Sequence, residues 1–130
     1  MTITDVKSIF NDINKSFAVF FTQKKLKLVI HNEVCSPEMH SVRDVAWADS
    51  RDMSVNIVKR VLDFSDDAII ALLRHEIAHS YDTYSALSGR EQRADDLAEL
   101  VCGDKIRYSG PMLIQTIGNG IYPRPLELPR

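Results

Sequence analysis

Two histidines four residues apart, with a glutamate directly after the first, form the clearest chemical pattern in the sequence: His75, Glu76 and His79. Four positions on an α-helix make slightly more than one turn, so both imidazole rings would leave the same face and bind one metal ion. Glu76 would lie about 100° around the helix, close to a water molecule on that ion. The pattern therefore predicts a helix that carries two metal ligands and a base.

A catalytic zinc ion usually takes three protein ligands and leaves a fourth position to water. Glu91 is the first candidate for the third ligand, because a chain that reverses through residues 85–89 and returns antiparallel brings Glu91 level with His79. Asp95, one turn further along, would then lie level with His75 and accept the ring N–H that the metal does not use. The other candidates for the third ligand are, in falling order, Asp82, Asp96, Glu99 and His40.

A structural interpretation of Glu91 competes with the metal interpretation. Ser88 and Glu91 have the spacing of a capping box, in which the glutamate bonds back to the start of its own helix. The charged residues around it would then form a solvated helix face. The nearby histidine pair favours the metal interpretation, because a third ligand explains both helices.

The N-terminal part of the chain predicts a helix and a strand that support this pair of helices. Apolar residues at steps of three and four predict an amphipathic helix over residues 4–21, with Thr4 and Asp5 at its start. Its expected buried stripe is Val6, Ile9, Phe10, Ile13, Phe17 and Phe20. Alternating apolar residues over 25–31 predict a half-buried strand.

The middle of the chain predicts a loop and a β-hairpin. Residues 32–41 look like a loop, and a zinc role for His31, Cys35 or His40 is a minor alternative, since their spacing matches no ligand pattern. Two β-prone runs, 44–49 and 53–59, are joined by turn-prone residues. Trp47, the only tryptophan, fits a packing role better than a substrate platform.

The second half of the chain predicts the two helices themselves. Ser65, followed by two aspartates, looks like the N-cap of a helix that runs to about residue 84. A second helix is expected over residues 91–102, with Gly103 placed to end it. Glycine and proline then break up residues 109–130, which we expect to form an irregular tail.

Composition indicates one ordinary domain spanning residues 1–130. The net charge of −2 gives no reason to expect nucleic acid as a partner. Cys35 and Cys102 are far apart and form neither a disulfide framework nor a zinc knuckle, so both are expected as reduced thiols. Charged residues interrupt the N-terminal apolar run, which argues against a signal peptide, a membrane segment or a membrane partner. We therefore expect a cytoplasmic location.

Together, His75-Glu76-Ile77-Ala78-His79 and Glu91-Gln92-Arg93-Ala94-Asp95 resemble the gluzincin metallopeptidases, especially the minimal-scaffold minigluzincins and the soluble relatives of the HtpX and ImmA/IrrE types. The resemblance covers about residues 4–105. It implies an α+β, zincin-like domain with an N-terminal helix, a small three-stranded and mostly antiparallel sheet, an active-site helix and an antiparallel glutamate helix. It further implies one Zn²⁺ per chain on His75, His79 and Glu91, with Glu76 as general base and Asp95 supporting a ligand.

The resemblance also implies an edge strand that holds bound peptide in an antiparallel arrangement. By position this strand is residues 53–59, which include Met53, Ser54, Val55, Asn56 and Ile57. The group that stabilises the oxyanion stays open among Tyr81, Tyr84, Arg107, Tyr108 and Tyr122.

The expected function is a zinc metallopeptidase that hydrolyses peptide bonds in a peptide or protein substrate. One alternative keeps the metal without turnover, as a zinc-stabilised regulatory or protein-binding module. A weaker alternative is a metal-free domain whose histidines pack in its core.

Overall fold

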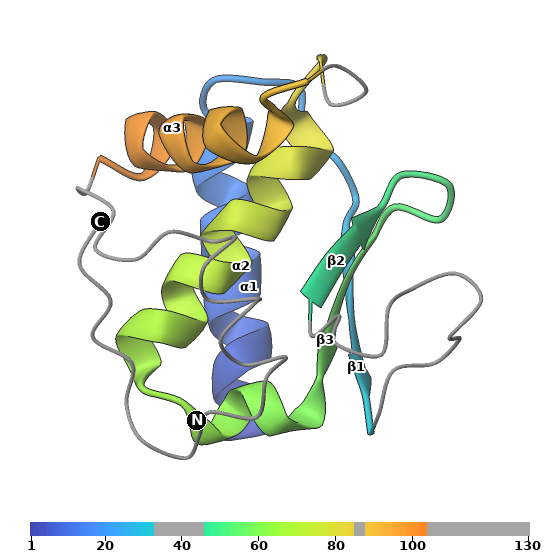
Figure 1. Cartoon of the computed structure of the whole chain (residues 1–130), viewed down its shortest axis with the longest axis vertical. Coiled ribbons are helices and arrows are strands. Elements are labelled where there is room, and N and C mark those ends of the chain that lie inside the picture. The colour runs from blue at the N-terminus through green and yellow to red at the C-terminus, as the bar shows by residue number, and fades with distance from the viewer. Residues whose placement is uncertain (33–45, 85–87, 104–130) are drawn as a thin grey trace.

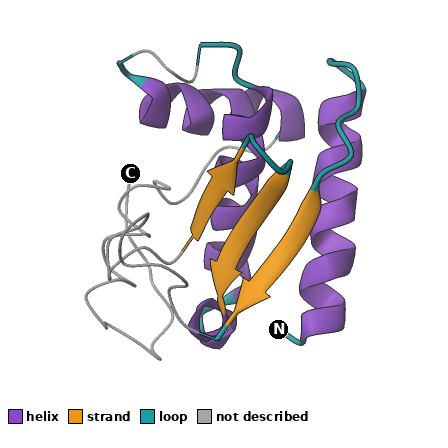
Figure 2. Ribbon diagram, turned by 90° about the vertical axis from the view of Figure 1, so that its right-hand side faces the viewer, coloured by secondary structure: helices purple, strands orange, loops and turns teal. Residues whose placement is uncertain are grey.

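A layer of helices packs against one face of a small β-sheet, with a third helix across the end of that layer (Figures 1 and 2). The computed structural model describes residues 1–32, 46–84 and 88–103. The elements, in chain order, are α1 Ile3–Ala18, β1 Lys27–His31, β2 Ala46–Asp49, β3 Ser54–Val58, the 3-10 helix η1 Lys59–Asp63, α2 Asp66–Tyr81 and α3 Arg90–Cys102. This arrangement confirms the expected α+β fold class. The part of the chain that the structure describes holds no helix long and apolar enough to cross a membrane.

The sheet has the strand order β1-β3-β2, so β3 is its central strand. The strands β2 and β3 form the predicted hairpin, while β1 pairs with β3 in parallel, which makes the sheet mixed. The prediction that Met53, Ser54, Val55, Asn56 and Ile57 form an edge strand is therefore wrong. The strand β3 has neighbours on both sides, and all five of its residues, Ser54–Val58, are buried. The strand that packs most against α2 is β2, at one edge of the sheet.

Helix α1 buries the predicted apolar stripe, except at its C-terminal end. Val6, Phe10, Ile13 and Phe17 are buried and Ile9 is partly buried, whereas Phe20 lies beyond the helix and is exposed. The capping residue is Thr2, two positions before the expected one. Its hydroxyl accepts from the Asp5 N–H while the Asp5 carboxylate accepts from the Thr2 N–H, which satisfies the first free donors of the helix.

Helix α2 begins as expected and ends three residues earlier than expected. The Ser65 hydroxyl accepts from the Ala68 N–H at its start, and the helix ends at Tyr81. Its buried residues include Leu72, Leu73 and Ile77, which place it in the middle of the core.

The C-terminal end of α2 is tied to α1 and to the chain that precedes β1. The Tyr81 hydroxyl donates to Asn14 Oδ1 at 2.6 Å and accepts from the Lys24 N–H at 3.0 Å. The Tyr81 ring stacks on Phe17, and the Lys24 ammonium group donates to the carbonyl of Ser80. Tyr81 is thus a structural residue of the core, which removes it from the candidates for an oxyanion donor.

Replacing Tyr81 by phenylalanine should lower the free energy of unfolding by about 1–3 kcal/mol, because the Asn14 oxygen and the Lys24 N–H lose their buried partner. Urea unfolding measures the change. Tyr84→Phe is the matched control, because the Tyr84 side chain is exposed and should change stability little. Equal stability of the two variants would contradict the assigned role of Tyr81.

Candidate metal centre

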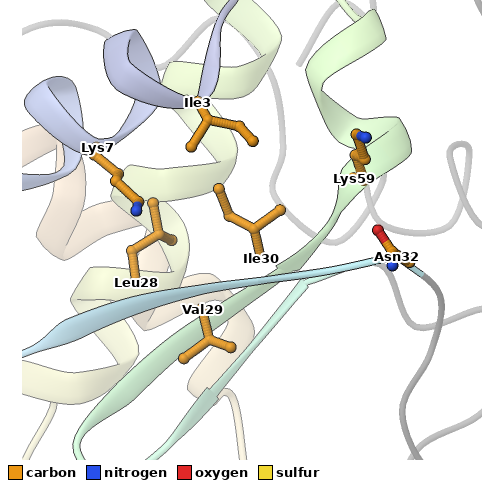
Figure 3. A pocket seen from close by; sticks show the side chains of 7 residues that line it. All are labelled: Ile3, Lys7, Leu28, Val29, Ile30, Asn32 and Lys59. Carbon is orange, nitrogen blue, oxygen red and sulfur yellow. The ribbon is translucent and has the colours of Figure 1, made fainter.

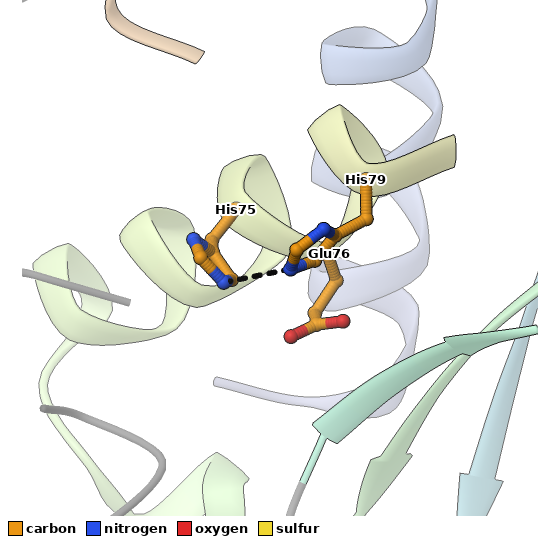
Figure 4. Close-up of side chains that lie close together, drawn as sticks. All are labelled: His75, Glu76 and His79. Carbon is orange, nitrogen blue, oxygen red and sulfur yellow. Dashed lines mark hydrogen bonds between the residues drawn. The ribbon is translucent and has the colours of Figure 1, made fainter. Parts of the chain in front are cut away.

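Three potential ligand atoms from two helices converge at one point between α2 and α3. His75 Nε2 and His79 Nε2 lie 3.1 Å apart. Figure 4 marks this contact with a dashed line. Glu91 Oε2 lies 2.9 Å from His75 Nε2 and 3.2 Å from His79 Nε2. Ligand atoms about 2.1 Å from a tetrahedral metal ion are about 3.4 Å from one another. The spacing of these three atoms is therefore close to that of a tetrahedral metal site.

Glu76 follows His75 on α2 and is buried beside the histidines. Its carboxylate and the two imidazoles have ligand atoms within 4.8 Å of one another, and Figure 4 shows its side chain leaving the helix next to theirs. Burial raises the pKa of Glu76, and the charges of His75 and His79 oppose that rise. Because the Glu91 carboxylate lies within hydrogen-bonding distance of both Nε2 atoms, Glu91 fits the position of third ligand and Glu76 that of a nearby base.

Asp95 holds the other side of the His75 ring. His75 Nδ1–H donates to Asp95 Oδ1 at 2.8 Å, and the His75 side chain has no exposed surface. Burial alone would lower the pKa of His75, but hydrogen bonds to Asp95 and Glu91 outweigh it and raise the pKa to about 10. Hydrogen bonds from His75, and to a smaller extent from His79, lower the pKa of Glu91.

The arrangement of donors fits a metal ion. With Nδ1–H directed at Asp95, a neutral His75 presents a lone pair at Nε2, opposite the lone pairs of His79 Nε2 and the Glu91 carboxylate. Such a convergence of electron pairs needs a cation at its centre. Without metal, a proton on His75 supplies this cation, and the hydrogen bonds to Asp95 and Glu91 that raise the pKa of His75 favour it.

The turn between α2 and α3 sets the position of Glu91. Helix α3 starts after Gly89, whose positive φ of 78° is unfavourable for other residues, and no side chain caps the helix. The capping box of Ser88 and Glu91 is therefore wrong, and the Glu91 carboxylate is left to face the histidines. The Arg93 guanidinium closes the turn by donating to the Asp82 carboxylate and to the carbonyls of Ser88 and Tyr84.

The other candidate residues that the structure describes are exposed, paired elsewhere or distant from these ligand atoms. Tyr84 is 61% exposed after the end of α2. Asp82 is paired with Arg93, and Asp96 is an exposed residue that accepts from Gln92. Glu99 lies two turns along α3 from Glu91. Arg107, Tyr108, Tyr122, Cys35 and His40 lie outside the described residues.

His31 takes part in a separate contact on the sheet. Its ring stacks on Trp47 at 5.2 Å between centroids, and its Nε2 lies 2.9 Å from Asn56 Oδ1. This contact gives Trp47 the packing role that its sequence context favours. Asn56, which is buried on the central strand, also donates to Ser54 Oγ.

Arg90 was not singled out from the sequence and lies at the edge of the site. Its Nε is 3.7 Å from Glu91 Oε1, its side chain is 62% exposed, and its charge counteracts the raised pKa of Glu76. In the sequence, the one feature that links Arg90 to the site is its position directly before Glu91, and this feature is not specific.

Comparison with known proteins supports the fold. No protein-family model and no curated protein matches the chain. Among solved structures, it is similar to the crystal structure of the metallopeptidase zymogen of Pyrococcus abyssi abylysin. The TM-score is 0.59 at 13% sequence identity, over 93% of this chain and 99% of that chain. At this identity, the similarity concerns the fold.

Without metal, the protein should lose stability as the pH rises above neutral. Because the pKa of His75 is raised from 6.5 to about 10, its contribution is fully present below the lower value and is lost as the pH rises through the higher one. The loss between pH 7 and pH 10, from urea unfolding in a chelator, should be on the order of 1–3 kcal/mol. His75→Gln should remove most of this slope, and an unchanged slope would contradict the assignment.

Asp95→Asn should weaken metal binding about 10- to 100-fold, because the amide is a poorer acceptor for His75 Nδ1–H. Competition with a chromophoric chelator measures the affinity. Asp96→Asn is the control, since it removes an equal charge from the next, exposed position and should leave the affinity within about twofold. Equal weakening in both variants would show a general charge effect.

Proposed function

We propose that this chain is a zinc-dependent metallopeptidase of the gluzincin type. The observation that carries the proposal is the convergence of His75 Nε2, His79 Nε2 and the Glu91 carboxylate, with atoms 2.9–3.2 Å apart, beside the buried Glu76. Two imidazoles and a carboxylate are a zinc donor set that leaves a fourth position to water. The similarity in fold to a metallopeptidase zymogen supports the same assignment.

In this proposal the ion, when bound, supplies a Lewis acid that lowers the pKa of water and polarises a carbonyl group. Glu76 takes a proton from the attacking water and later gives it to the amine that leaves when the peptide bond breaks. Burial raises the pKa of Glu76, which makes its carboxylate a stronger base for the proton of the water. Asp95 keeps His75 in the tautomer whose Nε2 can bind metal.

The substrate is a peptide or protein segment, and we assign its binding to β2. This edge strand packs against α2, which carries the histidines, and its outer side pairs with no other described strand. An extended peptide can add to such an edge through main-chain hydrogen bonds. In the proposed function β2 thus takes the role expected of residues 53–59, which are enclosed between neighbours.

Glu76→Gln should keep the metal and lose hydrolysis about 10²- to 10⁴-fold, because the amide cannot accept the proton of the water. Cleavage of an unfolded protein, followed by mass spectrometry, and zinc analysis of the same samples measure both properties. Glu99→Gln makes the same chemical change away from the centre and should retain full activity.

Two results would refute the proposal. If protein refolded without chelators holds clearly less than about one zinc ion per chain, the assignment of a zinc site is refuted. Full activity of Glu76→Gln would show that Glu76 is not the general base, and the proposed mechanism would be refuted.

A further inference from the structure

The second edge of the sheet, formed by β1, borders a cleft that is separate from the candidate metal centre. The cleft has a volume of about 370 Å³ and lies between the start of α1, the strand β1 and the start of η1. Strand β3 separates β1 from β2, and strands lie about 4.8 Å apart, so the two edges are about 10 Å from each other. One extended segment cannot occupy both edges.

The cleft combines an apolar floor with two positive charges. Figure 3 shows Leu28 and Ile30 pointing toward Ile3 of α1, with Lys7 and Lys59 on either side of them. Ile3 is 43% exposed although it is a large aliphatic residue. Both lysines are exposed, and neither forms an ion pair with a carboxylate among the described residues. A ligand with apolar and acidic groups would match this lining.

The main chain of β1 offers the third element of recognition. The Lys27 N–H donates to the Met53 carbonyl, on the side of β3. Because successive residues of a strand direct their N–H and C=O groups to opposite sides, those of Leu28 and Ile30 point away from β3. No other described strand pairs with this side. An extended peptide can pair there as an added strand.

From these features we infer that the β1 edge is a second peptide-binding site, which takes an extended segment of another protein whose cleft-facing residues are apolar in the middle and acidic at both ends. Its main chain pairs with Leu28 and Ile30, its apolar side chains enter the cleft, and its carboxylates reach Lys7 and Lys59. A second copy of this chain is a poor occupant, because Lys25 and Lys27 on the same strand region would meet the identical positive charges. The inference concerns binding alone and does not depend on peptide hydrolysis.

The experiment uses a blocked, fluorescein-labelled heptapeptide with glutamate at its first and last positions, valine at the third and fifth, and threonine between them, so that the glutamates and valines share one face. Its binding is measured by fluorescence anisotropy. Wild type and Glu76→Gln should bind it equally, which separates this site from the proposed active site. Lys7→Glu and Lys59→Glu should each weaken binding about fivefold or more. Lys15→Glu reverses an exposed charge on the same helix, two turns from Lys7, and should change binding less than twofold.

Two N-methylated probes of the same composition test the strand pairing. Methylation of every second nitrogen removes the hydrogen bonds on one side of the peptide, so one of the two probes should lose binding and the other should keep it. Hydrogen exchange followed by NMR should show new protection at the amides of Leu28 and Ile30, and little change at Lys27 and Val29.

Several outcomes would overturn the inference. The first is the absence of binding at about 1 mM probe. The second is equal binding by the Lys7, Lys59 and Lys15 variants. The third is equal binding of both methylated probes. Displacement of the probe by a single-stranded oligonucleotide, together with insensitivity to methylation, would indicate a general anion site instead. A dimer through β1 in sedimentation would assign the edge to a second copy.

Discussion

A buried imidazole held between two carboxylates is the interaction on which the arrangement of the helices depends. His75 of α2 has no exposed side-chain surface and contacts Asp95 at one ring nitrogen and Glu91 at the other. Both carboxylates belong to α3, one helical turn apart, so only one register of α3 on α2 satisfies both nitrogens. A buried polar group without a partner costs about 1–3 kcal/mol, which exceeds the net gain of a typical hydrogen bond. The packing of α3 on α2 and the positions of the potential ligand atoms are therefore fixed together.

The surrounding elements keep α2 in place without contributing donors. Its C-terminal end is held by the contacts of Tyr81 with Asn14 and Lys24, and its buried face packs on the sheet. The Arg93 guanidinium joins three groups of the turn that leads into α3. As a result, the main chain on both sides of the His79 to Glu91 connection is fixed by residues that do not touch the centre.

Helical spacing explains why much of the site could be predicted from the sequence. Steps of four residues transfer directly into three dimensions, so His75 and His79 on one helix, and Glu91 and Asp95 on the next, specify which atoms can meet. The strand order could not be obtained in this way. Alternating apolar residues in β1 look alike in an edge strand and a central strand, and nothing local indicates that β1 pairs with β3. The observed ends of α1 and α2 also differ from those predicted, since a helix cap depends on the path of the flanking chain.

The small residues of α3 have a consequence for the geometry of the candidate metal centre. Ala94 and Ala98 are fully buried where α3 meets the core, and the distance between packed helices depends on the size of the side chains between them. A larger side chain at either position would push α3 outward and carry the Glu91 oxygens away from both imidazoles. The spacing of the ligand atoms in the candidate metal centre is thus governed partly by two methyl groups that lie outside it.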